Sequence, residues 1–214
     1  MSKVAVKICG LTESRGLRAA IEYGASHIGL NFFRRSPRFV SIEQAARLAE
    51  KVPRSVMSVG LFVDPTDAEL TRVLDRVPLK MIQLHGQEPP ARVREVKTRT
   101  GLPVMKVIGV STARDVMGAS EFDPVADLLL FDAKPPAGAT RPGGNAVAFD
   151  WTLMRNYRGP LRWGLAGGLS KDNVAEAIAA SGARMVDVSS GVETRPGVKS
   201  PAKIRAFLAS VAAA

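Results

Sequence analysis

The sequence predicts a (β/α)8 barrel of the α/β class, a TIM barrel that spans residues 1–214 as one domain. Short β-rich runs alternate with stretches whose apolar residues recur at helical spacing, which is typical of βα units and a parallel sheet. Eight such units fit into 214 residues, close to the lower size limit of about 200 residues for this barrel. A doubly wound open sheet is the alternative, but no Gly-x-Gly-x-x-Gly follows the first strand.

Eight apolar, β-rich runs are expected to form the strands. In chain order they cover residues 4–9, 27–32, 56–62, 79–84, 104–109, 127–132, 161–165 and 185–188. Between them, apolar residues keep the i, i+3, i+4, i+7 spacing of amphipathic helices, for example over 17–24, 42–49 and 70–77. Ser41 with Gln44 and Thr66 with Glu69 match the capping box, and Ser200 marks the start of the last helix.

The composition excludes several classes of protein. With 46% hydrophobic and 23% charged residues, the chain can bury one sizeable core. The N-terminus enters the first strand directly and lacks the apolar segment of a signal peptide, and no uncharged run approaches the ~20 residues of a membrane-spanning helix. The single cysteine fits a reducing compartment, so we expect a soluble protein of the cytoplasm.

The formal net charge of +10 favours anionic partners. A nucleic-acid binder usually clusters its basic residues with stacking aromatics, whereas the lysines and arginines of this chain are spread through every segment. The one dense basic cluster, over 34–38, is short. A small phosphorylated or carboxylated substrate is therefore expected rather than a nucleic acid.

Polar side chains two residues apart fall at the carboxyl ends of several strands. Residues with this spacing share one face of a strand, and the carboxyl ends of barrel strands are where active sites are assembled. Asp132 ends an apolar run at the same level. The pairs are Lys7 with Cys9, Gln83 with His85, and Asp187 with Ser189.

Each of these residues also has a structural interpretation. Cys9 could be a small buried hydrophobic residue, but an ammonium at Lys7 would favour its thiolate and make it a better base or nucleophile. Asp132 could cap a helix or form a structural ion pair, and His85 could be a hydrogen-bonded loop histidine. No metal site is predicted, because His27 and His85 lie far apart and no Cys/His cluster exists.

Two glycine-rich motifs follow the seventh and eighth strands. Gly167 and Gly168 come directly before Leu169 and would bring bare backbone amides to a helix start, and the segment Ser189-Ser190-Gly191 has the same character. The loops after these two strands are where barrels often bind phosphate. A phosphate site is therefore expected there.

With these motifs, the chain resembles the phosphoribosylanthranilate isomerase family, the βα-barrel enzymes of tryptophan biosynthesis. The resemblance covers nearly the full length. It rests on KICGLT (7–12), GLNFFRRSPRFVS (29–41), QLHG (83–86), FDAK (131–134), FDW (149–151), LAGGL (165–169), VDVSSGVE (186–193) and PGVK (196–199).

The resemblance implies an Amadori rearrangement of N-(5-phosphoribosyl)anthranilate to the 1-amino-1-deoxyribulose 5-phosphate, without metal or organic cofactor. It implies that Asp132 is the general acid that opens the ribose ring and that Cys9 is the general base for the C2 hydrogen. Arg38 would pair with the anthranilate carboxylate, His85 would contact the substrate, and Asp187 would bind a ribose hydroxyl. The phosphate would be held by Gly167, Gly168, Ser189, Ser190 and Gly191.

The connection 133–148 before the sixth helix departs from the family pattern. Its length and its Pro and Gly content predict a mobile loop over the site. The family commonly shows Gly-Gly-x-Gly and then a basic residue before Phe-Asp-Trp, whereas Gly143-Gly144-Asn145-Ala146-Val147-Ala148 lacks the third glycine and the cation. A contact between this loop and the substrate is therefore not implied.

Two other functions stay open. The first is a related barrel that isomerises another phosphorylated sugar amine, such as the aminoimidazole ribotide of the histidine pathway; that family uses two aspartates, so Cys9 disfavours it. The second is a non-catalytic anion-binding or nucleic-acid-binding protein, for which only the net charge speaks. Oligomeric state and breadth of substrate scope are left open by the sequence.

Overall fold

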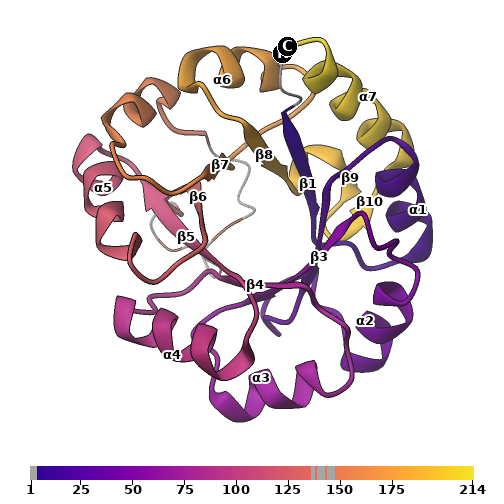
Figure 1. Ribbon diagram of the computed structural model, residues 1–214. Helices are drawn as coiled ribbons and strands as arrows, with labels where there is room; N and C mark the ends of the chain where they lie inside the picture. The colour runs from indigo at the N-terminus through magenta and orange to yellow at the C-terminus, as the bar shows by residue number, and fades with distance from the viewer. Residues whose placement is uncertain (1–3, 136–137, 139–142, 144–147) are drawn as a thin grey trace.

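Eight parallel strands close into a barrel in chain order, as a computed structural model shows for residues 4–135, 138, 143 and 148–214 (Figure 1). The predicted fold class is confirmed. Each strand pairs with its neighbours along the chain, and β8 closes the barrel by pairing with β1 in register from Ala5↔Met185 to Ile8↔Val188. The strands are β1 Ala5–Cys9, β2 His27–Asn31, β3 Met57–Phe62, β4 Met81–Leu84, β5 Val104–Val110, β6 Leu128–Ala133, β7 Trp163–Leu165 and β8 Met185–Val188.

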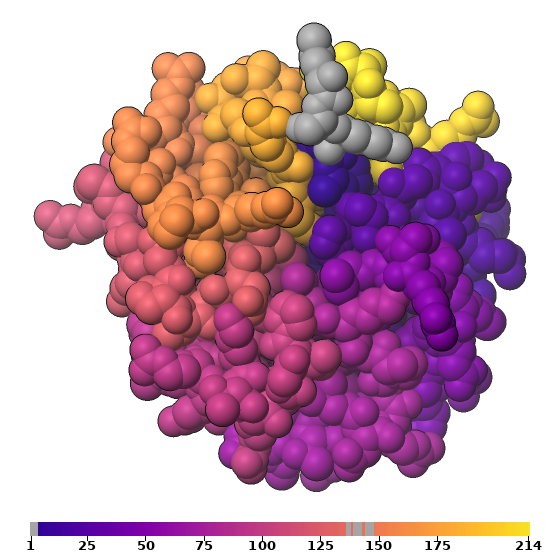
Figure 2. Space-filling model, in the orientation of Figure 1, coloured from indigo at the N-terminus to yellow at the C-terminus, as the bar shows by residue number. Residues whose placement is uncertain are grey.

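Helices surround the barrel and follow one another in chain order around the rounded body of the molecule (Figures 1 and 2). Among the described residues, no helix is both long and apolar enough to cross a membrane. The α-helices are α1 Ser14–Glu22, α2 Ile42–Ala49, α3 Asp67–Leu74, α4 Pro90–Thr100, α5 Ala113–Gly118, α6 Val174–Ser181 and α7 Pro201–Ala212. Three 3-10 segments accompany them, η1 Ala119–Phe122, η2 Trp151–Asn156 and η3 Ser190–Val192.

The sixth helix of the predicted pattern is the short 3-10 segment η2 instead of an α-helix. Asp150 caps it by accepting from the backbone N–H of Thr152, and the backbone N–H of Tyr157 bonds to the carbonyl of Met154 three residues earlier. Gly159 and the proline after it follow directly. The segment is therefore too short to establish regular i to i−4 bonding.

All three predicted helix caps are confirmed, and one of the two predicted capping boxes is complete. Thr66 and Glu69 form a complete capping box, and Ser200 caps α7. Ser41 accepts from the backbone N–H of Gln44, but the side chain of Gln44 donates to the carbonyl of Thr12 instead of returning to the cap. This contact ties α2 to the loop after β1.

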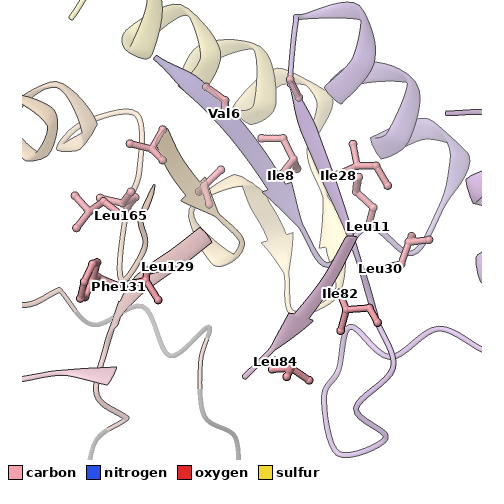
Figure 3. Packing of buried hydrophobic residues seen from close by; sticks show 14 of the residues in the cluster. Val6, Ile8, Leu11, Ile28, Leu30, Ile82, Leu84, Leu129, Phe131 and Leu165 are labelled. Atoms are coloured by element: carbon pink, nitrogen blue, oxygen red, sulfur yellow. The ribbon is translucent and has the colours of Figure 1, made fainter. Parts of the chain in front are cut away.

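Strand side chains alternate between two apolar layers. Val6 and Ile8 of β1 belong to the layer between strands and helices (Figure 3), so Lys7 and Cys9 face the barrel interior, as the spacing predicts. The lower interior of the barrel, below the mouth at the carboxyl ends of the strands, is filled by a separate apolar cluster. Its members are Val59, Met81, Met105, Val107, Leu128, Leu130, Ala166 and Met185.

A small antiparallel hairpin after η3 is absent from the sequence prediction. It consists of β9 Glu193–Arg195 and β10 Val198–Lys199, and its turn contains Gly197 with φ of 84°. The carbonyl of Gly197 accepts from the hydroxyl of Thr12 at 2.8 Å. A Cβ at Gly197 would collide with the carbonyl oxygen of Pro37. The hairpin therefore packs tightly against the loops after β1 and β2.

Candidate active site

A pocket opens at the carboxyl ends of the strands and gathers most of the predicted site residues. Gly191 is not among the residues that line it. The lining includes Cys9, Arg38, His85, Asp132, Gly167, Gly168, Asp187, Ser189 and Ser190. These residues come from β1, β6 and β8, and from the segments after β2, β4, β7 and β8, so the barrel brings together positions that are up to 181 residues apart (190 minus 9) in sequence.

Lys7 lies beneath Cys9 and is completely buried. Its ammonium is 3.0 Å from Oδ1 of Asp187 on the neighbouring strand β8. Burial by itself would lower the pKa of Lys7, but its interaction with Asp187, and a smaller one with Cys9, outweigh the effect of burial, so the pKa of Lys7 is raised. Lys7 is therefore a permanent cation within the barrel, and Asp187 is its counter-ion.

Burial and two neighbouring charges act on the pKa of Cys9. Burial raises the pKa of the Cys9 thiol and exceeds the opposing effect of Lys7, while Asp187 adds to the rise. The expectation that Lys7 favours the thiolate is confirmed for the effect of Lys7, and the net shift, which the sequence left open, is upward. The reason is that Asp187 neutralises Lys7 and that desolvation penalises a buried anion. Without substrate, Cys9 is a neutral thiol at neutral pH.

Gly29 on β2 makes room for the Cys9 and Lys7 side chains. It pairs with Cys9 across the two strands, and a Cβ built on it would lie 2.8 Å from Sγ of Cys9 and 3.3 Å from Nζ of Lys7. Sequence reasoning missed this residue. A glycine within a strand is the signal, since it often marks a close approach of other groups.

Asp132 and His85 face each other across the mouth. Oδ2 of Asp132 lies 3.4 Å from Nε2 of His85, while Oδ1 accepts from the backbone N–H of Ala133 at 2.9 Å. The amide nitrogen of Gln83 lies 3.4 Å from Nδ1 of His85. If the amide is assigned in this sense, Nδ1 accepts and the ring proton is on Nε2, facing Asp132.

A buried ion pair fixes the loop that carries His85. The ammonium of Lys106 on β5 lies 2.6 Å from Oε2 of Glu88 and donates to the carbonyl of Gly86 at 2.9 Å. Glu88 in turn accepts from the backbone N–H groups of Gly86 and Asp64. The residue next to His85 is thus held from both sides, which fixes the direction of the imidazole.

Arg38 is buried and engaged by a carboxylate of the hairpin. Its Nε and Nη2 donate to the two carboxylate oxygens of Glu193 at 2.8 and 2.9 Å, and its side chain packs on Gly10, where φ is 74° and a Cβ would lie 2.5 Å from Cδ of Arg38. Glu193 also accepts from the ammonium of Lys199 at 2.7 Å. Arg38 is therefore not a solvated loop arginine.

Lys199 and Glu193 are site residues that sequence reasoning did not single out. The ammonium of Lys199 donates to the carbonyl of Ser189 at 3.0 Å and to its hydroxyl at 3.2 Å, and that hydroxyl donates to the carbonyl of Cys9. Burial lowers the pKa of Lys199 to about 8 despite Glu193. Burial raises the pKa of Glu193, but Arg38 and Lys199 prevail and the pKa is lowered.

The glycines predicted to bind phosphate differ in their positions. Gly167 and Gly168 have φ of 90° and 60° and line the pocket, but α6 begins only at Val174, so they are not at a helix start as expected. Gly191 packs on the carbonyl of Leu169, where a Cβ would collide. Its observed contact therefore joins the loops after β7 and β8.

The predicted mobile loop 133–148 lies mostly outside the described residues. Gly143 is described and lines the pocket against the acid side. A Cβ on Gly143 would lie 2.6 Å from Cε1 of His85 and 2.7 Å from Oδ2 of Asp132. Within the described part of the chain, no group of three or more His, Cys, Asp or Glu residues could hold a metal ion.

A carboxylic acid on β6 and a thiol on β1 thus share one pocket with an arginine and two loops of phosphate-binding type. This combination defines the class of (β/α)8-barrel enzymes that carry out proton transfers on small anionic substrates.

Comparison with known proteins identifies the family. Residues 6–210 match the family model described as N-(5'phosphoribosyl)anthranilate (PRA) isomerase. The N-(5'-phosphoribosyl)anthranilate isomerase of Paracoccus denitrificans is 56% identical over 210 residues, which cover 98% of each chain. The chain therefore belongs to the phosphoribosylanthranilate isomerase family.

Solved structures agree with this assignment. The phosphoribosyl anthranilate isomerase of Thermotoga maritima matches with a TM-score of 0.86 and 34% identity over 99% of this chain and all of that one. A phosphoribosyl anthranilate isomerase in complex with reduced 1-(o-carboxyphenylamino)-1-deoxyribulose 5-phosphate matches with a TM-score of 0.83 and 33% identity, over 99% of this chain and 100% of that chain. That relative binds a ligand with a phosphate at one end and a carboxylate at the other.

Proposed function

We propose that this chain catalyses the Amadori rearrangement of N-(5-phosphoribosyl)anthranilate to 1-(2-carboxyphenylamino)-1-deoxyribulose 5-phosphate, the isomerisation step of tryptophan biosynthesis. One observation carries the proposal. A carboxylic acid and a thiol, Asp132 and Cys9, line the same pocket from different strands. The reaction needs one acid and one base on opposite sides of a sugar.

Asp132 acts as the general acid in this proposal. Ring opening needs a proton on the ribose ring oxygen, while the bond from that oxygen to C1 breaks and the nitrogen lone pair forms a C1–N iminium. In its protonated form Asp132 supplies this proton from Oδ2, which faces Nε2 of His85 at 3.4 Å, while Oδ1 is tied to the backbone N–H of Ala133. His85 thereby orients the acid and contacts the substrate.

Cys9 acts as the general base. It removes the hydrogen from C2, and the electron pair of that C–H bond forms the C1–C2 double bond of an enolamine, which tautomerises to the ketone. The raised pKa of the resting thiol is compatible with this role because the iminium is a cation formed beside it. A positive charge nearby favours the thiolate, so the thiol releases its proton to solvent in the open pocket as the iminium forms, and the thiolate is present when the C2 hydrogen is most acidic.

The two anionic ends of the substrate are held by different donors, neutral groups at one end and an arginine at the other. Backbone amides and hydroxyls of Gly167, Gly168, Ser189 and Ser190 bind the phosphate, and Arg38 binds the anthranilate carboxylate. Asp187 reaches a ribose hydroxyl while its Oδ1 holds Lys7. The scheme consists only of proton transfers, so no metal or organic cofactor is required.

We further propose that the partner is this small anionic substrate alone, without nucleic acid, and that the protein works in the cytoplasm. The spread of basic residues and the single cysteine support both statements.

The test is direct. Purified protein is incubated with freshly prepared phosphoribosylanthranilate, and the loss of substrate fluorescence is followed in time. We expect turnover without added metal and in the presence of a chelator. Absence of turnover would contradict the proposal, and turnover of an aminoimidazole ribotide substrate in its place would favour the histidine-pathway alternative.

A further inference from the structure

We propose that Glu193 and Lys199, the two buried charged residues of the β9–β10 hairpin, are positioning residues that join the carboxylate-binding and phosphate-binding ends of the pocket. The inference rests on the proposed function, in which Arg38 holds the carboxylate and Ser189 helps to hold the phosphate. Neither Glu193 nor Lys199 lines the pocket. Both act through residues that do.

Glu193 sets the direction of the Arg38 guanidinium. Its carboxylate takes Nε and Nη2 of Arg38 in a fork, so among the described residues the edge formed by Nη1 is left for the pocket. A guanidinium has five N–H donors in one plane, and fixing one edge fixes the direction of the other. Without Glu193, the arginine would have to be ordered by the substrate itself.

Lys199 sets the position of Ser189. Its ammonium donates to both oxygens of this residue, the backbone carbonyl and the hydroxyl. The hydroxyl donates onward to the backbone carbonyl of Cys9 at 3.1 Å. One ammonium therefore fixes the first residue of the phosphate loop relative to the strand that carries the base.

Glu193 is the shared partner that makes the two ends one unit. Its Oε1 accepts from Arg38 and from Lys199, at 2.8 and 2.7 Å. All three side chains are buried. Because buried charges have few alternative partners, moving one end of this chain of contacts must move the other.

The charge of the unit also fits an anionic ligand. Two cations and one carboxylate leave one net positive charge when Lys199 is protonated. Burial brings the pKa of Lys199 down to about 8, so this charge is present at neutral pH and is lost as the pH rises through that value. The groups that face Lys199 are Glu193 on β9, Ser189 after β8, Arg38 after β2 and Cys9 on β1; the side-chain stem packs on Gly16 of α1.

The first experiment compares Glu193→Gln and Lys199→Met with the unaltered enzyme. We expect Glu193→Gln to raise KM for phosphoribosylanthranilate at least about 10-fold while kcat stays within about 3-fold, because the lost interaction holds substrate and transition state alike. Lys199→Met should raise the inhibition constant of inorganic phosphate at least about 5-fold, which is the readout that a merely structural role would not move.

Lys203→Met is the matched control. Its ammonium donates to the backbone carbonyl of Glu193 at 2.7 Å but is outside the buried unit. It removes one positive charge from α7, next to the hairpin, and should leave KM and the phosphate constant unchanged. Equal effects in Lys199→Met and Lys203→Met would overturn the proposal, because they would show that net charge, and not the position of Lys199, determines KM and the inhibition constant of phosphate.

A second measurement needs no variant of the hairpin and guards against misfolding. Phosphate affinity of the unaltered protein and of Cys9→Ala is measured by calorimetry between pH 7 and pH 9.5. Since Lys199 loses its proton in this range, both proteins should bind phosphate more weakly as the pH rises through about 8. Constant affinity would overturn the role of Lys199. Failure of the unaltered protein to turn over its substrate would count against the proposed function instead, and these binding data would stand apart from it.

Discussion

The lower interior and the mouth of the barrel are built by the same strands and have opposite chemistry. Below, the inward side chains include Val59, Met81, Met105, Leu128 and Leu130, which form one apolar cluster. At the mouth, inward positions of these and neighbouring strands carry acids, bases and polar groups. On β6, for example, Leu128 and Leu130 are followed on the same face by Asp132.

This difference separates the residues that stabilise the fold from those that bind the substrate and transfer protons. Apolar side chains below need no partners, whereas each buried charge at the mouth is matched: Lys7 by Asp187, and Arg38 and Lys199 by Glu193. Replacements below should therefore act on the free energy of unfolding, and replacements above should act on turnover or binding.

The largest effect is expected for the acid and the base. Cys9→Ala and Asp132→Asn should each lower kcat at least ~10²-fold, the lower end for general acid–base groups. The thermal unfolding midpoint should change little, because neither change opens a large cavity. Steady-state kinetics with the fluorescent substrate and a thermal melt measure both. Near-normal turnover in either variant would remove that residue from the mechanism.

A replacement in the lower interior should have the converse effect, a loss of stability without a loss of turnover. Leu130 is fully buried, and Leu130→Ala should reduce the free energy of unfolding by about 2–5 kcal/mol through lost burial and a residual cavity. Turnover per folded molecule should stay within about twofold of the original. Urea unfolding and active-site titration provide the two numbers. A selective fall in kcat, with stability retained, would show that the two regions are not separate.

His27 is a polar residue on the inner face of β2, level with Lys7, and sharpens the comparison. It pairs with Lys7 in the β1–β2 register, and burial and the Lys7 charge lower its pKa to about 4. The unfolded chain takes up this proton first, near pH 6.5. Stability is therefore complete above that value and falls as the pH drops towards 4, by up to about 3 kcal/mol.

The measurement for His27 is urea unfolding between pH 4 and pH 7.5. His27→Gln should remove most of this pH dependence of the free energy of unfolding. The free energy of unfolding at pH 7.5 should change less than the pH dependence does. An unchanged slope in His27→Gln would assign the acid sensitivity to other groups.

The smallest effect concerns the long-range field. With a net charge of +10, attraction of the polyanionic substrate should make kcat/KM fall a few-fold between about 0.05 and 0.5 M salt, because screening shortens the reach of the field. kcat at saturating substrate should not change. Stopped-flow or steady-state rates at several salt concentrations test this, and a salt-independent kcat/KM would show that surface charge has no part in substrate capture.

Much of the fold could be predicted because it depends on local pattern. Period-two and helical spacing located all eight strands, and the spacing within β1 placed Lys7 and Cys9 on the inner face. The sixth helix was predicted with the wrong type, because a capped six-residue segment looks helical in sequence although it forms only a 3-10 helix. Gln44 was half predicted, since its backbone role is local and its side-chain partner, Thr12, is 32 residues away.

The sequence by itself determined the barrel, the strand ends that meet at the mouth, and the residue types of an acid–base site. Tertiary structure decided the partners of those residues. Burial outweighed the effect of Lys7 on the pKa of Cys9, Gly191 proved to hold two loops together, and Glu193 contacts both Arg38 and Lys199. The physical reason is range: side-chain alternation is written into neighbouring residues, whereas desolvation and ion pairing depend on groups that only the closed barrel brings within a few ångströms.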